Sequence, residues 1–306
     1  MGKIGKTMML SALVLGIVFF ALGFGSADRA GISMEQMMER VMANIREMNI
    51  APALNEYSDV FEQDRIPLDD SVTKIVIHSS FPDFNITSGG AGAVDVLIEG
   101  SIHSAFADEL YAWSTADGCL TLDIAKIYSR TPSATGLHVS IDLPAEFTGE
   151  IEINTVSGNV YLEAAAGQIG VKTTSGDIAI RSEGKSVIKA GSVSGNLEIN
   201  GESIRFDASS LSGNANISGE QLEGTASTVS GSITLTGNQL TGDSKLNSVS
   251  GSVEANLLGS YDFTADSTSG NIQTSGGDGA NSGRMGEGGS RLDIQTTSGD
   301  ISLQQP

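Results

Sequence analysis

A serine–glycine motif recurs eight times in this 306-residue chain and constrains its fold more than any other feature. The first copy is Thr155-Val156-Ser157-Gly158-Asn159; every copy has Ser or Thr three residues before the glycine, Ser directly before it, and Asn, Asp or Ser after it. These residues favour tight turns. The glycines are Gly158, Gly176, Gly195, Gly213, Gly231, Gly251, Gly270 and Gly299, at intervals of 18, 19, 18, 18, 20, 19 and 29 residues. A period near 19 indicates a repeat architecture.

Apolar residues recur at fixed distances from the glycines and define the columns of the expected core. Columns two and four residues after the glycine alternate with polar positions, as strands do, and so do the columns five and seven before it. A fifth column, two before the glycine, is also mostly apolar: Val156, Thr174, Val193, Leu211, Val229, Val249, Thr268 and Thr297. If this column also points inward, the alternation slips by one residue, and a bulge or corner is expected there.

Each copy therefore predicts a bent rung of two short strands. A rung of this kind buries only one face, so it is stable when stacked on similar rungs about 4.8 Å apart. The sequence thus predicts an all-β fold, a parallel β-solenoid of rungs of about 19 residues. In that register Ile180, Ile199 and Ile217 should stack on one another, and the Asn/Asp/Ser column should form a side-chain ladder along one corner.

The repeated motif, followed by alternating aliphatic residues and preceded by the segment Leu137–Pro144, resembles the bacterial putative adhesin family of β-strand repeats, the DUF4097 type. The resemblance covers roughly residues 72–306. Two copies depart from the pattern, with Ala215 and Ala255 at inward positions. The resemblance implies a β-repeat fold and an adhesion-like role.

The N-terminal residues have the features of an export signal. Lys3 and Lys6 precede an apolar run from Met8 to Phe24, and small residues follow at Gly25-Ser26-Ala27. This pattern predicts a secretory signal peptide over residues 1–27, cleaved after Ala27. The alternative is an uncleaved membrane anchor through residues 8–24, because this run reaches the lower length limit for a spanning helix.

Residues 28–71 predict an amphipathic helix and an acidic linker. Ser33 and Gln36 can form a capping box for a helix from Ser33 to Met48, which carries a methionine-rich stripe. We expect this helix to cover the open end of the solenoid; a dimerising helix and a membrane-surface helix are the alternatives. Residues 49–71 are the expected linker.

The β-repeat domain is expected over residues 72–306, with regular rungs from residue 151 onwards. Before them, the pattern predicts strands at Val72–Ile77, Val94–Ile98, Leu110–Trp113, Leu120–Ile124 and Leu137–Leu143. They are interpreted as irregular first rungs, with a small separate β-domain as the alternative. The glycine-rich segment Ser275–Ser290 is expected to be a floppy loop.

Composition and spacing argue against several classes of function. The formal net charge of −20 argues against binding to nucleic acid or to anionic membrane surfaces. Cys119 is the only cysteine, so no internal disulfide can form, and it is expected on the strand face opposite Leu120. His78, His103 and His138 lie far apart without zinc-site or catalytic-triad spacing. No catalytic, cofactor-binding or metal-binding residues are predicted, and no cofactor.

The sequence therefore predicts a non-catalytic, exported structural or adhesion-like protein of the cell envelope. It would be periplasmic, secreted or at the cell surface, and its partner would be an unidentified protein or glycan of the envelope. The alternative is an envelope-stress or regulatory sensor that binds a partner through the N-terminal helix. A glycan-active enzyme is the third hypothesis; such β-helices have longer, three-sheet rungs and a local cluster of acidic and basic residues.

Overall fold

The computed structural model describes residues 57–103, 110–125, 135–275 and 281–305. The chain divides into two units, Met1–Ser58 with Ile102–Asp108 and Asp59–Ser101 with Glu109–Pro306. The second unit is the one described below. The expected signal segment, residues 1–27, and the expected helix, Ser33–Met48, lie outside the described residues. Among the residues that are described, no helix has the length and apolar character needed to cross a membrane.

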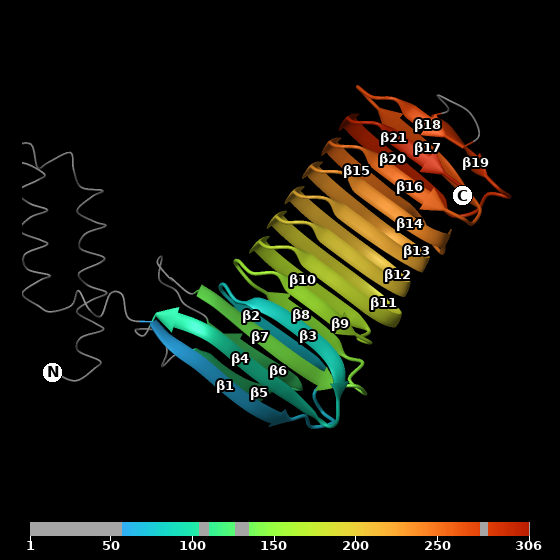
Figure 1. The fold of residues 1–306 in the computed structure, drawn as a ribbon. Helices are drawn as coiled ribbons and strands as arrows, with labels where there is room; N and C mark the ends of the chain where they lie inside the picture. The colour runs from blue at the N-terminus through green and yellow to red at the C-terminus, as the bar shows by residue number, and fades with distance from the viewer. Residues whose placement is uncertain (1–56, 104–109, 126–134, 276–280, 306) are drawn as a thin grey trace, which may run out of the picture. The chain divides into compact units, whose positions relative to one another are not determined.

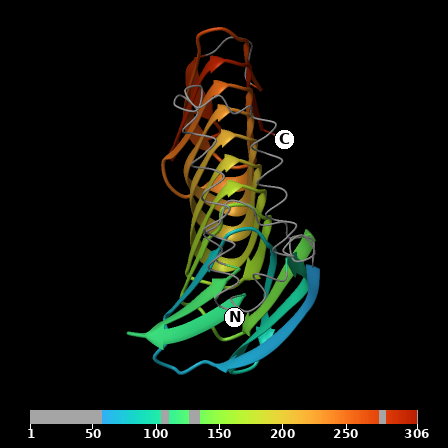
Figure 2. The same cartoon turned by 90° about the vertical axis from the view of Figure 1, so that its left-hand side faces the viewer.

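The regular rungs of the second unit are strands stacked in parallel, one rung per copy of the motif (Figures 1 and 2). The strands of the regular rungs are β8 (Glu150–Asn154), β9 (Val160–Ala164), β10 (Gln168–Ser175), β11 (Ile178–Ser194), β12 (Leu197–Ser212), β13 (Ala215–Ser230), β14 (Ile233–Leu240), β15 (Ser244–Ser250), β16 (Val253–Leu257), β17 (Tyr261–Ser267), β18 (Ile272–Thr274), β20 (Arg291–Ser298) and β21 (Ile301–Gln304).

Each rung contributes one strand segment to each of two faces. Face 1 contains the segments that precede the motif glycines, and face 2 contains the segments that follow them. The long strands β11, β12 and β13 pass from face 2 of one rung into face 1 of the next. We call the line of turns where the chain passes from face 1 to face 2 the serine–glycine edge. The fold confirms a solenoid-like repeat of parallel strands.

The core confirms four of the five predicted columns. The stacked column of Ile180, Ile199 and Ile217 pairs rung to rung, and each side chain is buried. The apolar residues two and four after the glycine, and those five and seven before it, fill the space between the faces. Two alanines, Ala215 and Ala255, occupy inward positions and are fully buried without any change of register.

The prediction for the fifth column is wrong, because this column faces the solvent and not the core. The aliphatic residues two before the glycine are exposed, as Val193 shows. The hydroxyl residues three before it are buried, as Ser192 shows, with Ser267 half-buried. The alternation runs without a slip from seven to three residues before the glycine, and the turn begins only at the next residue. The predicted bulge between the two columns is therefore absent from the regular strands β10, β15 and β20.

The last rung of the sequence is not the last rung of the stack. Strands β20 and β21 pair with β15 and β16 on one side and with β17 and β18 on the other. The Gly299 rung is thus inserted between the Gly251 and Gly270 rungs (Figure 1). The segment Ser275–Ser290, expected to be a floppy loop, carries strand β19 (Ser282–Met285), which pairs antiparallel with β17.

The N-terminal end of the stack is also out of sequence order. Strands β2 (Lys74–Ser79) and β3 (Asp83–Gly90) form a rung between β8–β9 and the later strands β6 (Cys119–Ile124) and β7 (Thr135–Pro144). Strands β4 (Ala93–His103) and β5 (Tyr111–Ala116) then pair antiparallel with β7 and β6.

The five strands expected between residues 72 and 143 are present, whereas two others were missed. Strand β1 (Tyr57–Pro67) covers much of the segment interpreted as a linker, so that part of the interpretation is wrong. Strand β3 was missed because Pro82 takes the glycine position of its rung, and the serine–glycine motif is therefore lacking.

Candidate functional site

The motif glycines are required because neighbouring rungs approach closely at the serine–glycine edge. A Cβ atom on Gly195, Gly213 or Gly231 would lie 1.9–2.1 Å from the carbonyl oxygen of the preceding glycine in the stack. Real Cβ contacts of this kind do not occur, so any side chain would force two backbones apart. The glycines thus set the rung spacing at this edge, and positive φ is not the common reason for their presence.

The buried hydroxyl column satisfies the carbonyl groups of these glycines. In six of the eight rungs, the hydroxyl three before the glycine donates to the glycine carbonyl of the adjacent rung: 3.0 Å from Ser210 Oγ to Gly195, and 3.1 Å from Thr228 Oγ1 to Gly213. Ser192, Ser248, Ser267 and Thr296 make the same bond. The Thr155 and Thr173 hydroxyls are buried without a hydrogen-bond partner among the described residues. At the six bonded positions an aliphatic residue would leave a buried carbonyl without its donor, which explains why this inward column is polar.

The predicted side-chain ladder is present on the other side of the glycines. The Oδ1 atom of one rung accepts the backbone N–H of the next: Asn159 from Asp177 at 3.0 Å, and Asn196 from Asn214 at 3.0 Å. The remaining links join Asp83 to Asn159, Asp177 to Asn196, Asn214 to Ser232 and Asp300 to Asn271. These side chains hold adjacent turns in register, so the sequence-based expectation is confirmed.

The exposed column two before the glycine forms an apolar stripe along this edge. Its aliphatic members are 43–55% exposed, and we call them the aliphatic ridge: Val156, Val193, Leu211, Val229 and Val249. Thr174, Thr268 and Thr297 continue the column. The serine directly before each glycine stands next to the ridge. The edge therefore presents one aliphatic or threonine side chain and one serine hydroxyl per rung.

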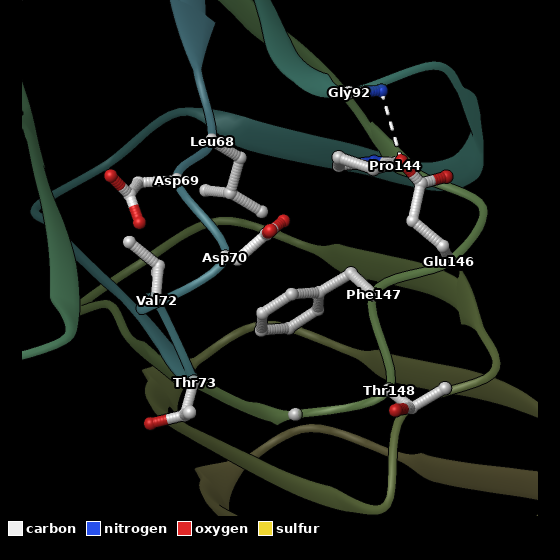
Figure 3. A pocket seen from close by; sticks show the side chains of 11 residues that line it. Leu68, Asp69, Asp70, Val72, Thr73, Gly92, Pro144, Glu146, Phe147 and Thr148 are labelled. Carbon is white, nitrogen blue, oxygen red and sulfur yellow. Dashed lines mark hydrogen bonds between the residues drawn. The ribbon is translucent and has the colours of Figure 1, made fainter.

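A separate cavity of about 310 Å³ lies near the N-terminal end of the stack (Figure 3). It is lined by Leu68, Asp69, Asp70, Val72, Thr73, Gly92, Pro144, Glu146, Phe147, Thr148 and Gly149. The Glu146 carboxylate accepts the backbone N–H of Gly92 at 3.1 Å, and Phe147 is buried. The lining thus combines carboxylates with one aromatic ring, groups that favour an organic cation.

Hydrogen bonding also sets the electrostatics around this cavity. The backbone N–H of Ser71 donates to Asp69 at 2.8 Å, which lowers the pKa of that carboxyl. On face 1, Lys74 lies 2.7 Å from Glu152 and 2.9 Å from Glu150. The pKa of Glu152 is lowered below its ordinary value of 4.5, most strongly by the hydrogen bond from Lys74 and next by the one from Asn154.

Cys119, His78 and His138 do not form one site, and the side chain of His103 lies outside the described part of the chain. Cys119 lies on the strand face opposite the buried Leu120, as predicted, with its Sγ 3.9 Å from Thr121 Oγ1. His78 Nδ1 lies 3.0 Å from Asp123 on the neighbouring strand, while His138 is exposed on β7. Throughout the described ranges, no three His, Cys, Asp or Glu residues are grouped in a way that could hold a metal ion.

The buried hydroxyl column is the feature that sequence reasoning placed incorrectly. Its signal was available, because seven, five and three residues before the glycine form an unbroken series of odd positions. The aliphatic column is the more hydrophobic of the two, so the sequence predicts that column to be buried instead. The cavity had no sequence signal, because its walls come from the β1–β2, β3–β4 and β7–β8 connections, which are far apart in the chain.

Comparison with solved structures gives remote similarities. A crystal structure described as a putative adhesin from Bacteroides fragilis is 14% identical, with 81% of this chain and 98% of that chain covered and a TM-score of 0.49. A putative lipid binding protein from Parabacteroides distasonis is 14% identical, with 80% and 97% covered and a TM-score of 0.37. A putative adhesin from the same organism is 12% identical, with 80% and 97% covered and a TM-score of 0.34. Similarities this low leave function open.

No curated protein matches the chain. The family described as Toastrack DUF4097 matches over residues 72–304, which includes every regular rung. This range also includes the irregular strands from β2 to β7. The chain therefore belongs to the Toastrack DUF4097 family.

Proposed function

We propose that this protein is a non-catalytic, exported module of the cell envelope that binds an envelope protein or glycan along its serine–glycine edge. The observation that supports this most directly is the aliphatic ridge, because exposed aliphatic residues recur along one line while the rest of each outward surface is mainly polar. Contiguous exposed apolar surface commonly marks an interaction site.

The chemistry of the edge also supports binding rather than catalysis. Its repeated groups are hydroxyls, amides, aliphatic side chains and the carboxylates of Asp177 and Asp300, and each rung presents a similar set. A surface of this kind distributes its contacts over many rungs, whereas a catalytic site concentrates reactive groups at one place. The binding partner would therefore be an extended molecule that contacts several rungs.

The test is binding to isolated envelope fractions by the full chain and a ridge variant. Replacing Leu211 and Val229 by Ser should weaken binding roughly tenfold, because both side chains point away from the core. Leu258→Ser is the matched control: this residue is 53% exposed but lies outside the edge. Equal binding by all three proteins would contradict the proposal.

Digesting the envelope fraction identifies the type of partner. Loss of binding after protease treatment indicates an envelope protein, and loss after glycan digestion indicates a glycan. A hydrolytic or lyase activity, abolished by a point substitution that leaves the protein folded, would favour the enzyme hypothesis instead.

The sensor alternative depends on the amphipathic pattern of Ser33–Met48. Deleting residues 33–48 distinguishes the two hypotheses. Under the edge proposal, envelope binding persists after the deletion and is weakened in the Leu211→Ser/Val229→Ser variant. Under the sensor hypothesis, the deletion abolishes partner binding and the edge substitutions leave it unchanged.

Export through the N-terminal segment is a further part of the proposal. We expect cleavage after Ala27, because small residues precede that bond and the polar Asp28 follows it. Intact-mass spectrometry of the protein from its native cells measures this directly. An uncut chain in the membrane fraction would instead support an anchor through residues 8–24.

A further inference from the structure

The two outer faces of the stack carry opposite net charges. In the five rungs from Gly176 to Gly251, consider the three outward columns nearest the serine–glycine edge on each face. On face 1, in the columns four, six and eight residues before the glycine, they contain three lysines, one arginine and three acidic residues, a net charge of +1: Lys172, Lys189, Lys245, Arg205, Asp207, Glu223 and Asp243. On face 2 they contain one arginine and five glutamates, a net charge of −4: Arg181, Glu183, Glu198, Glu202, Glu220 and Glu254. Within these columns, face 1 thus carries a small net positive charge on an acidic protein.

Two lysines and two glutamates also have the same spacing along the stack. Lys189 and Lys245 lie six residues before Gly195 and Gly251, and strand pairing places them three rungs apart in one column. Glu198 and Glu254 lie three residues after the same glycines, and pairing again places them three rungs apart. The displacement from Lys189 to Glu198 therefore matches that from Lys245 to Glu254.

The other positions in these two columns are also compatible. In the rungs between, Asp207 corresponds to Asn216 and Thr225 corresponds to Thr234. In the Gly176 rung, the small residues Gly170 and Ala179 correspond. Across these five rungs no like charges coincide, and like charges would oppose contact.

The charged groups are available for contact from outside. Lys189 and Lys245 are exposed, and no ion pair involves either one within the part of the chain that the structure describes. The Glu198 and Glu254 carboxylates accept hydrogen bonds from Asn200 at 3.0 Å and Asn256 at 2.9 Å. These amides orient the carboxylates and leave their charge uncompensated.

We propose that a second copy of this chain packs side by side with the first, with parallel axes and matched rungs, so that face 1 meets face 2. Lys189 would then pair with Glu198 of the partner subunit, and Lys245 with Glu254 of the partner subunit. The relation between copies is a translation, which does not close on itself, so further copies extend a row. This contact uses the broad faces and is independent of the proposed binding role of the serine–glycine edge.

The test is sedimentation velocity of the full chain at about 0.15 M salt, where screening beyond ~8 Å reduces the general repulsion between acidic copies. The wild-type protein should form concentration-dependent oligomers. Lys189→Glu/Lys245→Glu should weaken association roughly tenfold, and so should Glu198→Lys/Glu254→Lys. All four positions are on the outer surface, and circular dichroism checks that the variants fold.

Charge reversal on both faces provides the decisive control. Mixing the two double variants should restore association, because acidic faces of one then meet basic faces of the other. The quadruple variant, with all four substitutions in one chain, should associate with itself. Lys185→Glu/Arg284→Glu makes the same change in net charge outside both columns and should leave association unchanged.

Several results would overturn the proposal. One is a wild-type protein that stays monomeric at all concentrations. This holds also if the monomer binds an anionic polymer through the lysines of face 1. Another is association that the double variants do not weaken, or that mixing fails to restore. If the Lys189→Glu/Lys245→Glu variant does not fold, the Lys189→Ala/Lys245→Ala variant takes its place and must weaken association. Unchanged association in that variant also overturns the proposal.

Discussion

At the scale of single residues, the absence of a side chain has the largest structural effect. The motif glycines allow two backbones to approach to a distance at which a methyl group cannot fit, and the neighbouring hydroxyl then satisfies the carbonyl at that point. A small residue and a polar residue thus act together at each turn. Neither requirement is visible from hydrophobicity.

Gly213→Ala should destabilise the protein by about 3 kcal/mol, because its Cβ would lie 2.0 Å from the Gly195 carbonyl oxygen. Gly170→Ala is the matched control. A Cβ there lies 3.9 Å from its nearest neighbours, so this change should be neutral or stabilise by up to about 1 kcal/mol. Chemical denaturation measures both, and equal effects would refute the close-approach explanation.

The Lys74–Glu152 pair should give the protein an acid-sensitive contribution to stability. The folded-state pKa of Glu152 is lowered, so the contribution is present above pH 4.5 and is lost as the pH falls through the folded-state pKa. The pKa of Lys74 is raised by the same interaction, so its contribution is present at acidic and neutral pH and is lost only as the pH rises through its folded-state pKa, far above neutral.

Lys74→Gln should therefore lower the free energy of unfolding at pH 7 and have less effect at pH 3. Denaturant titrations of both proteins at the two pH values measure the difference. Lys185→Gln, an exposed lysine on β11, serves as the control. A Lys74→Gln effect that is as large at pH 3 as at pH 7 would rule out this ion pair as its source.

At the scale of elements, the sequence predicts the rung well and its turn poorly. Period-two alternation placed Ile180, Ile199 and Ile217 correctly, because burial of aliphatic residues dominates the energetics of a strand. At the turn the Val193 side chain is exposed and the Ser192 hydroxyl is buried. Backbone hydrogen bonding, rather than hydrophobicity, decides the orientation there.

The corrected register predicts opposite responses from two nearby positions. Ile199→Asp should cost roughly 4 kcal/mol or more, because it buries an unpaired charge. Val193→Asp should change stability by less than about 1 kcal/mol, because this side chain is 45% exposed. Thermal and chemical denaturation of the two variants measure this, and a Val193→Asp variant that fails to fold would restore the original assignment.

At the scale of the whole stack, the order of the rungs could not be predicted from the sequence. All rungs share the same columns, so any rung can stack on any other, and the motif carries no information about neighbours. The only indication is the interval of 29 residues before Gly299, which by itself predicts an inserted loop and not a change in rung order. The N-terminal cavity was equally unpredictable, because it depends on how the irregular rungs are ordered.

The inserted Gly299 rung predicts an unusual pattern of protection. Amides in β20 and β21 should exchange more slowly than those in β18, although they are closer to the C-terminus, because β20 and β21 are paired on both sides. Hydrogen–deuterium exchange with peptide mapping compares segments 291–304 and 269–275. Faster exchange in 291–304 would show that the stack ends in sequence order.

The inserted rung also affects when folding can finish. A nascent or exported chain becomes available from its N-terminus onward, yet the Gly270 rung has no parallel native neighbour until the last sixteen residues are free. Until then the Gly251 rung presents an open strand edge, onto which the Gly270 rung could stack out of order because its columns match. We expect a slow, late kinetic step in which this premature pairing is undone and the final segment enters between two rungs made before it.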